Sequence, residues 1–455
     1  MIIVVDRAND GILEERRTSI FCNSKQSGCE LKCEKDSLAG SVSQRACVYC
    51  GARVVLNPIT DAFHIVHGPI GCASYTWDIR GSLTSGPETF RNSFSTDLRE
   101  DDIIFGGEKK LEKAIDEICA QYSPKVIFIY ATCIVGVIGD DIEAVCKNAE
   151  ARHGIRVIPV KSSGFAGNKS MGYKAAGKAL MKLMDGPKQI KNEKEDNKNF
   201  NINFLGDFNL AGEIWITTGY LKQMGIEINA RFTGDSRCEE IMKAPEASLN
   251  IVQCAGSMTS LAKEMEEKYG IPYIKVSFFG LEDIRHSLMS IAEYTKDPDI
   301  IERTEKLIFI EELKVQAELR KYSSRLEGKK AAIYVGGGFK AISLIKQFAD
   351  LGIRTVMVGT QTGRKDEYDI IREIAEEGTV ILDDTNPAEL EKFIKEKGAD
   401  ILVGGVKERP LAYKLGVAFC DHNHERKHPL CGYEGAVNFA KEIDMTINSP
   451  VWRYV

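Results

Sequence analysis

Long hydrophobic runs are missing from this chain of 455 residues. No apolar stretch approaches the ~20 residues that a membrane-spanning helix needs, so no such helix is expected. The first residues, MIIVVDRANDG, lack both a basic flank and a long apolar core. We therefore expect no signal peptide and a cytoplasmic protein. A hydrophobic share of 43% and a mean hydropathy of -0.20 are ordinary for a globular protein with two or three domains.

Clusters of positive charge are also missing. The formal net charge is -6, and no arm is rich in lysine or arginine, which argues against nucleic acid as the main partner. Thirteen cysteines without a secretory signal are better explained by metal chemistry than by disulfides. Three of them, Cys119, Cys146 and Cys238, fall inside helix-like segments and are expected to be buried core thiols.

Neither of the common nucleotide motifs is present. Gly164, Gly167 and Lys169 follow a strand-like run and open a helix-like one, as in a phosphate loop. The lysine follows Asn168, however, and the spacing is shorter than a Walker A loop requires, so ATP binding is not expected. The glycines at 336–338 do not fit G-x-G-x-x-G, which disfavours a dinucleotide site.

Strand-like apolar runs alternate with helix-like segments along most of the chain. The first such stretch contains the helix candidates GEKKLEKAIDEICAQY and DDIEAVCKNAEARHG and the strand candidates KVIFIYAT and IRVIPV. Strand candidates FLGDFN, IEINARF, LNIVQC and PYIKVSF follow, and then KKAAIYVGGG, RTVMVG, TVILDD and ADILVGG. Continuous apolar strands between helices predict parallel sheets covered on both faces.

We therefore predict an α/β protein with three doubly wound parallel-sheet (Rossmann-like) domains. Ligands of such sheets bind at the carboxyl ends of the strands. The charged, polar segment 185–200 is expected to be a linker, and 281–326 a largely helical crossing. The predicted parts are a mobile amino-terminal extension at 1–40 and domains at 41–190, 200–325 and 326–455.

Metal-binding residue types are concentrated at 45–80, which reads RACVYCGARVVLNPITDAFHIVHGPIGCASYTWDIR. Cys47, Cys50 and Cys72 lie beside glycines there, and thiolates at turns make rigid sites suited to zinc or to an iron–sulfur cluster. Cys133, at the end of an apolar strand, could join them from a distance. Spacing alone leaves open the alternative of buried free thiols that pack as small hydrophobes.

Several long segments resemble the α-type subunits of the nitrogenase superfamily, in the same order. They are RACVYCG, HIVHGPIGCASYTWDIRG, FSTDLREDDIIFGGEKKL, ATCIVGVIGDDIEAVC, CAGSMTSLAKEMEEKYGIPY and GYEGAVNFAKEIDMTINSPVW, and they span nearly the whole chain. The resemblance implies a nitrogenase component 1-like fold. Within the family it is greatest to the scaffold subunits on which the iron–molybdenum cofactor is matured. The alternative is a catalytic α subunit of a nitrogenase or nitrogenase-like reductase.

The resemblance implies that Cys47, Cys72 and Cys133 hold a [4Fe–4S] cluster at a subunit interface. Three thiolates leave one iron without a protein ligand, so a NifN-type β subunit would supply the fourth. Cys50 stays open between a zinc or redox site with its neighbours and a spectator. A zinc-stabilised α/β protein of sugar-nucleotide type is a third interpretation of the whole chain.

A second site is implied around Cys254, which ends a strand and precedes a helix whose amino terminus favours a thiolate. In the family this cysteine anchors one end of the cofactor. The catalytic subunit holds the other end with a histidine where this sequence has Cys431. It also has a histidine that helps to reduce substrate where this sequence has Tyr173. Cys431 could ligate in place of the histidine, fix an immature cluster more weakly, or only pack.

Three basic residues are implied to line the cofactor cavity: Arg80, Lys169 and Lys340. A metal–sulfur cluster with a bound polycarboxylate is strongly anionic, so arginine and lysine donors would stabilise it. An extra glycine in YVGGGFKA shifts the alignment of Lys340 with the basic position of the family. The alternative for each lysine is an ordinary solvated surface charge.

Two further groups of possible ligands stay open. Three histidines within DHNHERKHPLC fit either a transient metal-entry site or a polar loop. Three cysteines in the amino-terminal extension match no standard zinc or ferredoxin spacing, so they are either structural or ligands of an additional cluster. These residues are His422, His424 and His428, and Cys22, Cys29 and Cys33.

The scaffold interpretation also implies a set of partners. The chain would form an α2β2 heterotetramer with the NifN-type subunit and receive an 8Fe precursor of the L-cluster type from a radical enzyme. Molybdenum and homocitrate would be inserted with the help of the nitrogenase iron protein. The finished cofactor would then pass to the apo catalytic nitrogenase component. No residue of the chain is expected to perform acid–base catalysis.

Overall fold

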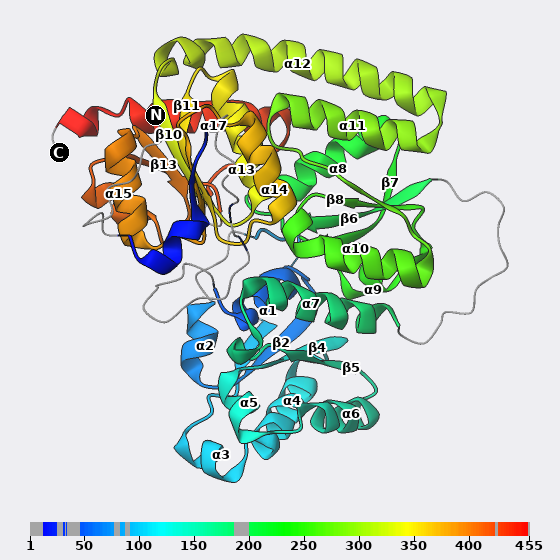
Figure 1. Cartoon of the computed structure of the whole chain (residues 1–455). Helices are drawn as coiled ribbons and strands as arrows, with labels where there is room; N and C mark the ends of the chain where they lie inside the picture. Colours follow the sequence, from blue (N-terminus) through cyan, green and yellow to red (C-terminus); the bar gives the residue numbers. More distant parts are fainter. Residues whose placement is uncertain are drawn as a thin grey trace. The chain divides into compact units, whose positions relative to one another are not determined.

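The computed structural model describes residues 12–24, 31, 33, 46–76, 82–86, 92–185, 200–423 and 426–453 (Figure 1). These residues form two compact units. We call Ala46–Phe278 together with Arg285–Ile308 the cysteine unit. The described residues within 1–45, Phe279–Ile284 and Phe309–Val455 form the terminal unit.

The first sheet of the cysteine unit is entirely parallel, with strand order β3-β2-β4-β5. Every residue of the central strands β2 and β4 is buried, because helices cover both faces of their apolar runs. The strands are β2 (Ala62–His67), β3 (Ser93–Ser95), β4 (Val126–Ala131) and β5 (Arg156–Lys161). The helices are α1 (Val48–Leu56), α2 (Ile70–Tyr75), α3 (Glu100–Phe105), α4 (Glu108–Tyr122), α5 (Cys133–Ile138), α6 (Ile142–His153), η3 (Gly164–Ala166) and α7 (Lys169–Met184).

The second sheet of the cysteine unit is also parallel, with order β7-β6-β8-β9. Its buried side chains share one hydrophobic core with α1, α7 and the first sheet. The strands are β6 (Asn201–Asp207), β7 (Glu227–Thr233), β8 (Leu249–Val252) and β9 (Tyr273–Lys275). The helices are α8 (Glu213–Met224), α9 (Cys238–Met242), η4 (Ala244–Glu246) and α10 (Ala255–Tyr269).

The third sheet lies in the terminal unit and has the order β1-β12-β11-β10-β13-β14. The five strands β10 to β14 are parallel and reverse their order at β10, as a doubly wound sheet does. The strands are β1 (Ile20–Cys22), β10 (Lys330–Val335), β11 (Arg354–Thr360), β12 (Val380–Asp383), β13 (Ile401–Gly404) and β14 (Ala418–Asp421). The helices are η1 (Glu14–Ser19), α13 (Gly338–Asp350), α14 (Lys365–Ile374), α15 (Pro387–Lys397), α16 (Arg409–Lys414), α17 (Gly432–Ile447) and η5 (Pro450–Arg453).

The predicted α/β class with doubly wound parallel sheets is confirmed. The helical crossing at 281–326 is confirmed as well, and consists of α11 (Leu281–Thr295) and α12 (Pro298–Leu326). Apart from β1, the strands of the three sheets fall in the three predicted stretches, while the domain boundaries themselves stay a prediction. Most of the predicted linker, 186–199, lies outside the described residues. Among the described residues, no helix is both long and apolar enough to cross a membrane.

Residues 14–22 of the predicted amino-terminal extension form a 3₁₀ turn and a short strand of the third sheet. Strand β1 pairs antiparallel with β12 and so closes one edge of the third sheet. The preceding turn η1 is fixed by Arg16, whose Nε lies 3.0 Å from Oε1 of Glu389. A guanidinium nitrogen of Arg16 also donates to the carbonyl oxygen of Asp383 at 2.7 Å. The strand was missed because only three residues of it pair, too few for a hydrophobic period.

Candidate functional site

Three of the predicted ligands lie at the amino termini of short helices at one edge of the first sheet. Cys47 is the residue that caps α1, Cys72 is the third residue of α2, and Cys133 is the first residue of α5. Helices α2 and α5 follow the carboxyl ends of β2 and β4, the edge at which parallel sheets bind ligands. The three cysteines are therefore presented at helix amino termini, where backbone N–H groups have no partner within the helix.

Gly164 brings two of these cysteines together. Its N–H donates to Sγ of Cys133 at 3.1 Å. A β carbon on Gly164 would lie 2.9 Å from Sγ of Cys133 and 3.7 Å from Cβ of Cys47, so this glycine sits between the two side chains. Burial raises the pKa of the Cys72 thiol, and the neighbouring Cys133 and Cys47 thiols raise it further. Cys47 and Cys133 therefore belong to one group, and Cys72 interacts electrostatically with both.

A second close contact joins the loops that carry Cys72 and Cys133. A β carbon on Gly68, just before α2, would lie 2.1 Å from Oγ1 of Thr132, just before α5. The Thr132 hydroxyl donates to the carbonyl oxygen of His67 at 2.9 Å. The sequence predicted the cysteines but not the close contacts of Gly68 and Gly164, because a glycine in a loop gives no signal of what it packs against.

The donor set fits an iron–sulfur cluster better than a single metal ion. Among the described residues, no three Cys, His, Asp or Glu side chains converge closely enough to hold one metal ion. A cluster binds each cysteine through a different iron, so its ligands need not converge on one point. Cys47, Cys72 and Cys133 are all partly exposed, which leaves the group open to a ligand from another chain.

A second group of side chains surrounds Lys169 at the start of α7. Lys169 is 8% exposed, and its ammonium lies 5.9 Å from the centre of the Tyr173 ring one turn further along. Burial opposes the charged ammonium, but interactions with the Tyr173 phenol and with Cys50 leave the pKa of Lys169 raised. Cys254, which caps α10, acts on Lys169 in the same direction.

The structure does not assign the remaining predicted cofactor residues, Lys340, Cys431 and Arg80, to the group of Lys169 and Cys254. Lys340 donates to the carbonyl oxygen of His422 at 2.9 Å and lies 5.5 Å from the centre of the Phe279 ring. Cys431 caps α17 and is fully buried. It belongs to the terminal unit, whereas Cys254 belongs to the cysteine unit. Arg80 lies outside the described residues.

The histidine-rich segment and the amino-terminal cysteines do not gather into a site among the described residues. His422 is fully buried between the rings of Phe279 and Phe439, and burial holds its pKa well below the ordinary value. Neither a metal-entry site nor a polar loop fits that position. His428 is exposed, and His424 and Cys29 lie outside the described residues. The other two cysteines, Cys22 and Cys33, are exposed and partly exposed.

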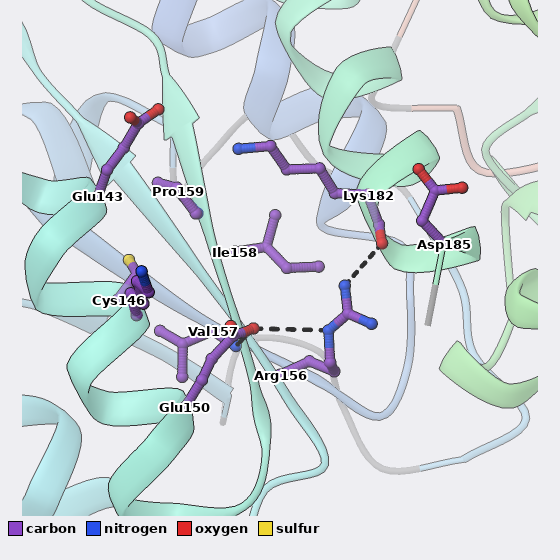
Figure 2. Close-up of a pocket in the computed structure, with 10 residues that line it drawn as sticks. Glu143, Cys146, Glu150, Arg156, Val157, Ile158, Pro159, Lys182 and Asp185 are labelled. Atoms are coloured by element: carbon purple, nitrogen blue, oxygen red, sulfur yellow. Dashed lines mark hydrogen bonds and ion pairs between the residues drawn. The ribbon is translucent and has the colours of Figure 1, made fainter. Parts of the chain in front are cut away.

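A charged groove of about 350 Å³ lies between β5, α6 and α7, and none of the predicted ligands Cys47, Cys72, Cys133 and Cys254 lines it (Figure 2). Arg156 spans it, with Nε 3.5 Å from Glu150 and a second nitrogen donating to the carbonyl oxygen of Lys182 at 2.7 Å. Glu150 also accepts from the N–H of Val157 at 3.0 Å. Burial raises the pKa of Cys146 in this groove to about 12, so it offers no reactive thiolate.

The fold and the grouped thiols together define a class: a parallel-sheet α/β protein with a sulfur-ligand group at the carboxyl edge of its first sheet. Residues 47–448 match the family described as nitrogenase component 1 type oxidoreductase, and the chain belongs to that family.

Individual relatives agree with this assignment. The chain is 68% identical to the nitrogenase iron-molybdenum cofactor biosynthesis protein NifE of Clostridium pasteurianum, with 99% of each chain covered. It is 53% identical to the protein of the same name from Methanosarcina barkeri, with 97% of each covered. A solved structure titled "Nitrogenase Cp1 at pH 5" superposes with a TM-score of 0.88 at 31% identity, covering 98% of each chain.

Proposed function

We propose that the chain is a scaffold subunit for maturation of the nitrogenase iron–molybdenum cofactor. It would hold an iron–sulfur precursor while molybdenum and homocitrate are inserted. The shared name of its relatives, a cofactor biosynthesis protein, supports this role at up to 68% identity. The structural observation that carries the proposal is the packing of Gly164 between Cys47 and Cys133, because it groups sulfur donors at a partly exposed edge.

Cys47, Cys72 and Cys133 would hold a resident [4Fe–4S] cluster. When bound, such a cluster supplies one-electron redox chemistry. The chain's own part is to present three thiolates at helix amino termini, with the Gly164 N–H hydrogen-bonded to Cys133. Hydrogen bonds to a ligand sulfur stabilise its negative charge and tune the cluster. A NifN-type β subunit in an α2β2 complex would supply the fourth ligand.

The precursor cluster is the cargo of this scaffold, and Cys254 would anchor it. Lys169, on whose pKa Cys254 acts electrostatically, would stabilise the negative charge of the cluster and of its homocitrate. Arg80, Lys340 and Cys431 are further proposed cofactor-binding residues, as the family resemblance implies. The chain would bind and shield the cargo without transferring protons to it.

The other partners follow from this role. A radical enzyme would deliver the 8Fe precursor, and the nitrogenase iron protein would assist insertion of molybdenum and homocitrate. The apo catalytic nitrogenase component would accept the finished cofactor. The rival function, substrate reduction by a catalytic α subunit, is disfavoured because Tyr173 replaces the histidine that the resemblance assigns to substrate reduction, and Cys431 replaces the one that holds the cofactor.

The test is anaerobic co-purification of the chain with its β-type partner, before and after exposure to the precursor, with iron, sulfide and molybdenum analysis. We expect one small cluster per αβ pair at first, and additional iron, then molybdenum, after loading. A complex that never gains metal beyond the small cluster would contradict the scaffold role. Reduction of acetylene at appreciable rates would favour the catalytic rival.

A further inference from the structure

His67 is a buried side chain at the carboxyl end of β2, the central strand that pairs with β4 (Figure 1). Its ring lies between two polar side chains. Nδ1 is 3.1 Å from the hydroxyl oxygen of Thr96, and Nε2 is 3.1 Å from Oδ2 of Asp140. The Gly68 N–H donates to the same Thr96 hydroxyl at 3.1 Å. Both ring nitrogens therefore have partners, and the orientation of the ring is fixed.

Asp140 holds one side of this ring. Its side chain is 4% exposed, and the Gly107 N–H donates to both of its carboxylate oxygens at 3.1 Å. Because these oxygens act as acceptors, the Nε2 of His67 carries a hydrogen and donates it to Asp140. A β carbon on Gly107 would lie 2.8 Å from Oδ2 of Asp140 and 3.0 Å from Cε1 of His67. The three residues are therefore packed in direct contact.

His67 is thereby attached to the chain at both ends of α5, the helix that begins with Cys133. Before the helix, Thr132 donates its N–H and its hydroxyl to the carbonyl oxygen of His67, at 3.2 Å and 2.9 Å. After the helix, only Gly139 separates the last helical residue from Asp140. A helix of six residues has few hydrogen bonds of its own, so attachments at its ends determine where it lies.

The same histidine leads into the loop before α2, the helix that carries Cys72. Gly68 directly follows His67, and a β carbon on Gly68 would lie 2.1 Å from Oγ1 of Thr132. The loops before α2 and α5 are thus in contact and cannot approach each other further. With its ring held by one loop and its carbonyl oxygen by the other, His67 fixes the relative position of Cys72 and Cys133.

Packing alone does not require a histidine at this position. Burying a polar ring is unfavourable unless its nitrogens are hydrogen-bonded, so an apolar side chain would fill the same space at a lower cost. The polar atoms of Thr96, His67 and Asp140 all have hydrogen-bond partners. A buried network that is fully satisfied favours one arrangement of the groups it connects. The network therefore supplies precise placement of the two loops.

We propose that His67, oriented by Asp140, is a positioning residue for the resident iron–sulfur cluster. It acts through the backbone, by holding Cys72 and Cys133 at the separation that the cluster requires. Ligands held in place in this way bind metal more tightly than ligands that must be ordered on binding. This inference rests on the proposed resident cluster, and it assigns a role to a histidine that no sequence motif singled out.

The test uses the full complex with the β-type partner, purified anaerobically without precursor, so that the resident cluster is the one observed. Asp140→Ala cuts the attachment after α5. Thr132→Val removes the hydroxyl bond before α5 and keeps a branched side chain. For Asp140→Ala we expect about 10-fold faster loss of iron to a chelator, as is typical when a residue that supports metal ligands is removed. The electron paramagnetic resonance spectrum and the reduction potential of the cluster should shift, and Thr132→Val should change in the same direction.

Asp141→Ala is the matched control. It removes the neighbouring carboxylate, which caps α6 by accepting from the Ala144 N–H at 3.0 Å. Loss of this cap should lower the thermal midpoint, while iron loss, spectrum and potential should equal those of wild type. The inference would be overturned by an Asp140→Ala complex that is less stable than wild type but has the iron loss, spectrum and potential of wild type.

Thr132→Val decides the question if Asp140→Ala does not assemble with the partner. Iron loss, spectrum and potential equal to those of wild type in Thr132→Val would then overturn the positioning role and leave the resident cluster intact. A wild-type complex without a [4Fe–4S] signal would instead contradict the proposed resident cluster itself.

Discussion

The Arg16 guanidinium and the Glu389 carboxylate form a buried ion pair between residues 373 positions apart in the sequence. The two side chains are 10% and 2% exposed, and Glu389 also accepts from the Thr385 hydroxyl at 2.6 Å. The pair joins the start of the described chain to the amino terminus of α15 and so holds β1 at the sheet edge.

Replacing one partner of this pair should destabilise the terminal unit. Arg16→Met leaves Glu389 buried without its cation, which we expect to cost about 3 kcal/mol and to lower the thermal midpoint by several degrees. The double variant Arg16→Met/Glu389→Gln should recover part of that loss, because no unpaired charge remains. Equal midpoints for the wild type and the single variant would show that the pair contributes nothing.

The crossing of α1 and α7 should not tolerate a methyl group. A β carbon on Gly172 would lie 2.7 Å from the Gly51 α carbon, so Gly172→Ala must push the helices apart. We expect a loss of about 3 kcal/mol in unfolding free energy from such overpacking. Gly219→Ala is the control: that helical glycine has open space around it, and alanine there should stabilise by roughly 0.5–1 kcal/mol. Thermal denaturation measures both changes, and a Gly172→Ala variant as stable as wild type would contradict the prediction.

Glu408 should make the terminal unit less stable as pH rises. Burial raises its pKa from 4.5 to about 7, although the Gly405 N–H donates to it at 2.8 Å. Below pH 4.5 the carboxyl is protonated whether folded or unfolded, so it carries no cost. Between the two pKa values the unfolded chain releases its proton first, and the cost reaches roughly 3 kcal/mol above pH 7.

Glu408→Gln should therefore gain stability over wild type between pH 5 and pH 8 in thermal denaturation, with little difference at the lower end. Glu391→Gln is the matched control, because Lys395 and Lys414 lower the pKa of that partly exposed carboxyl. It is ionised over this whole range in both states, so its difference from wild type should not change with pH. A parallel trend in both variants would contradict the assignment to Glu408.

Serine at Cys72 should remove the resident cluster and leave the fold in place. The thiol is partly exposed and its helix α2 buries none of its own residues, so the substitution disturbs little packing. We expect iron and visible absorbance of the precursor-free complex to fall to near zero, with an unchanged circular dichroism spectrum. Cys119→Ser, a partly exposed thiol in α4, should keep both. Full iron content in Cys72→Ser would remove this residue from the ligand set.

The sequence was sufficient to predict the parallel sheets because their central strands are buried on both faces and read as continuous apolar runs. Strands β4 and β11 are examples, and each was predicted within a residue. Strand β2 was missed because His64 and His67 interrupt its apolar pattern. Their polarity is satisfied inside the fold by Tyr130 and Asp140, which no local pattern reveals.

Some residues of the candidate site could likewise be predicted from the sequence, and others could not. Residue type and family resemblance led to Cys47, Cys72, Cys133 and Cys254. The environment of Cys50 could not be predicted, because its neighbours lie on helices more than one hundred positions away in the sequence. Close approaches such as those of Gly51 and Gly164 depend on how backbones meet in space, and a glycine alone does not report its neighbour.

The outer edge of β5 has a consequence for how the chain behaves before it meets a partner. This strand ends its sheet, and its outward N–H groups would otherwise offer a template for pairing with another copy. Pro159 has no N–H to offer, and the Val157 N–H is already taken by Glu150. A newly made chain is thereby protected against edge-to-edge aggregation on that side.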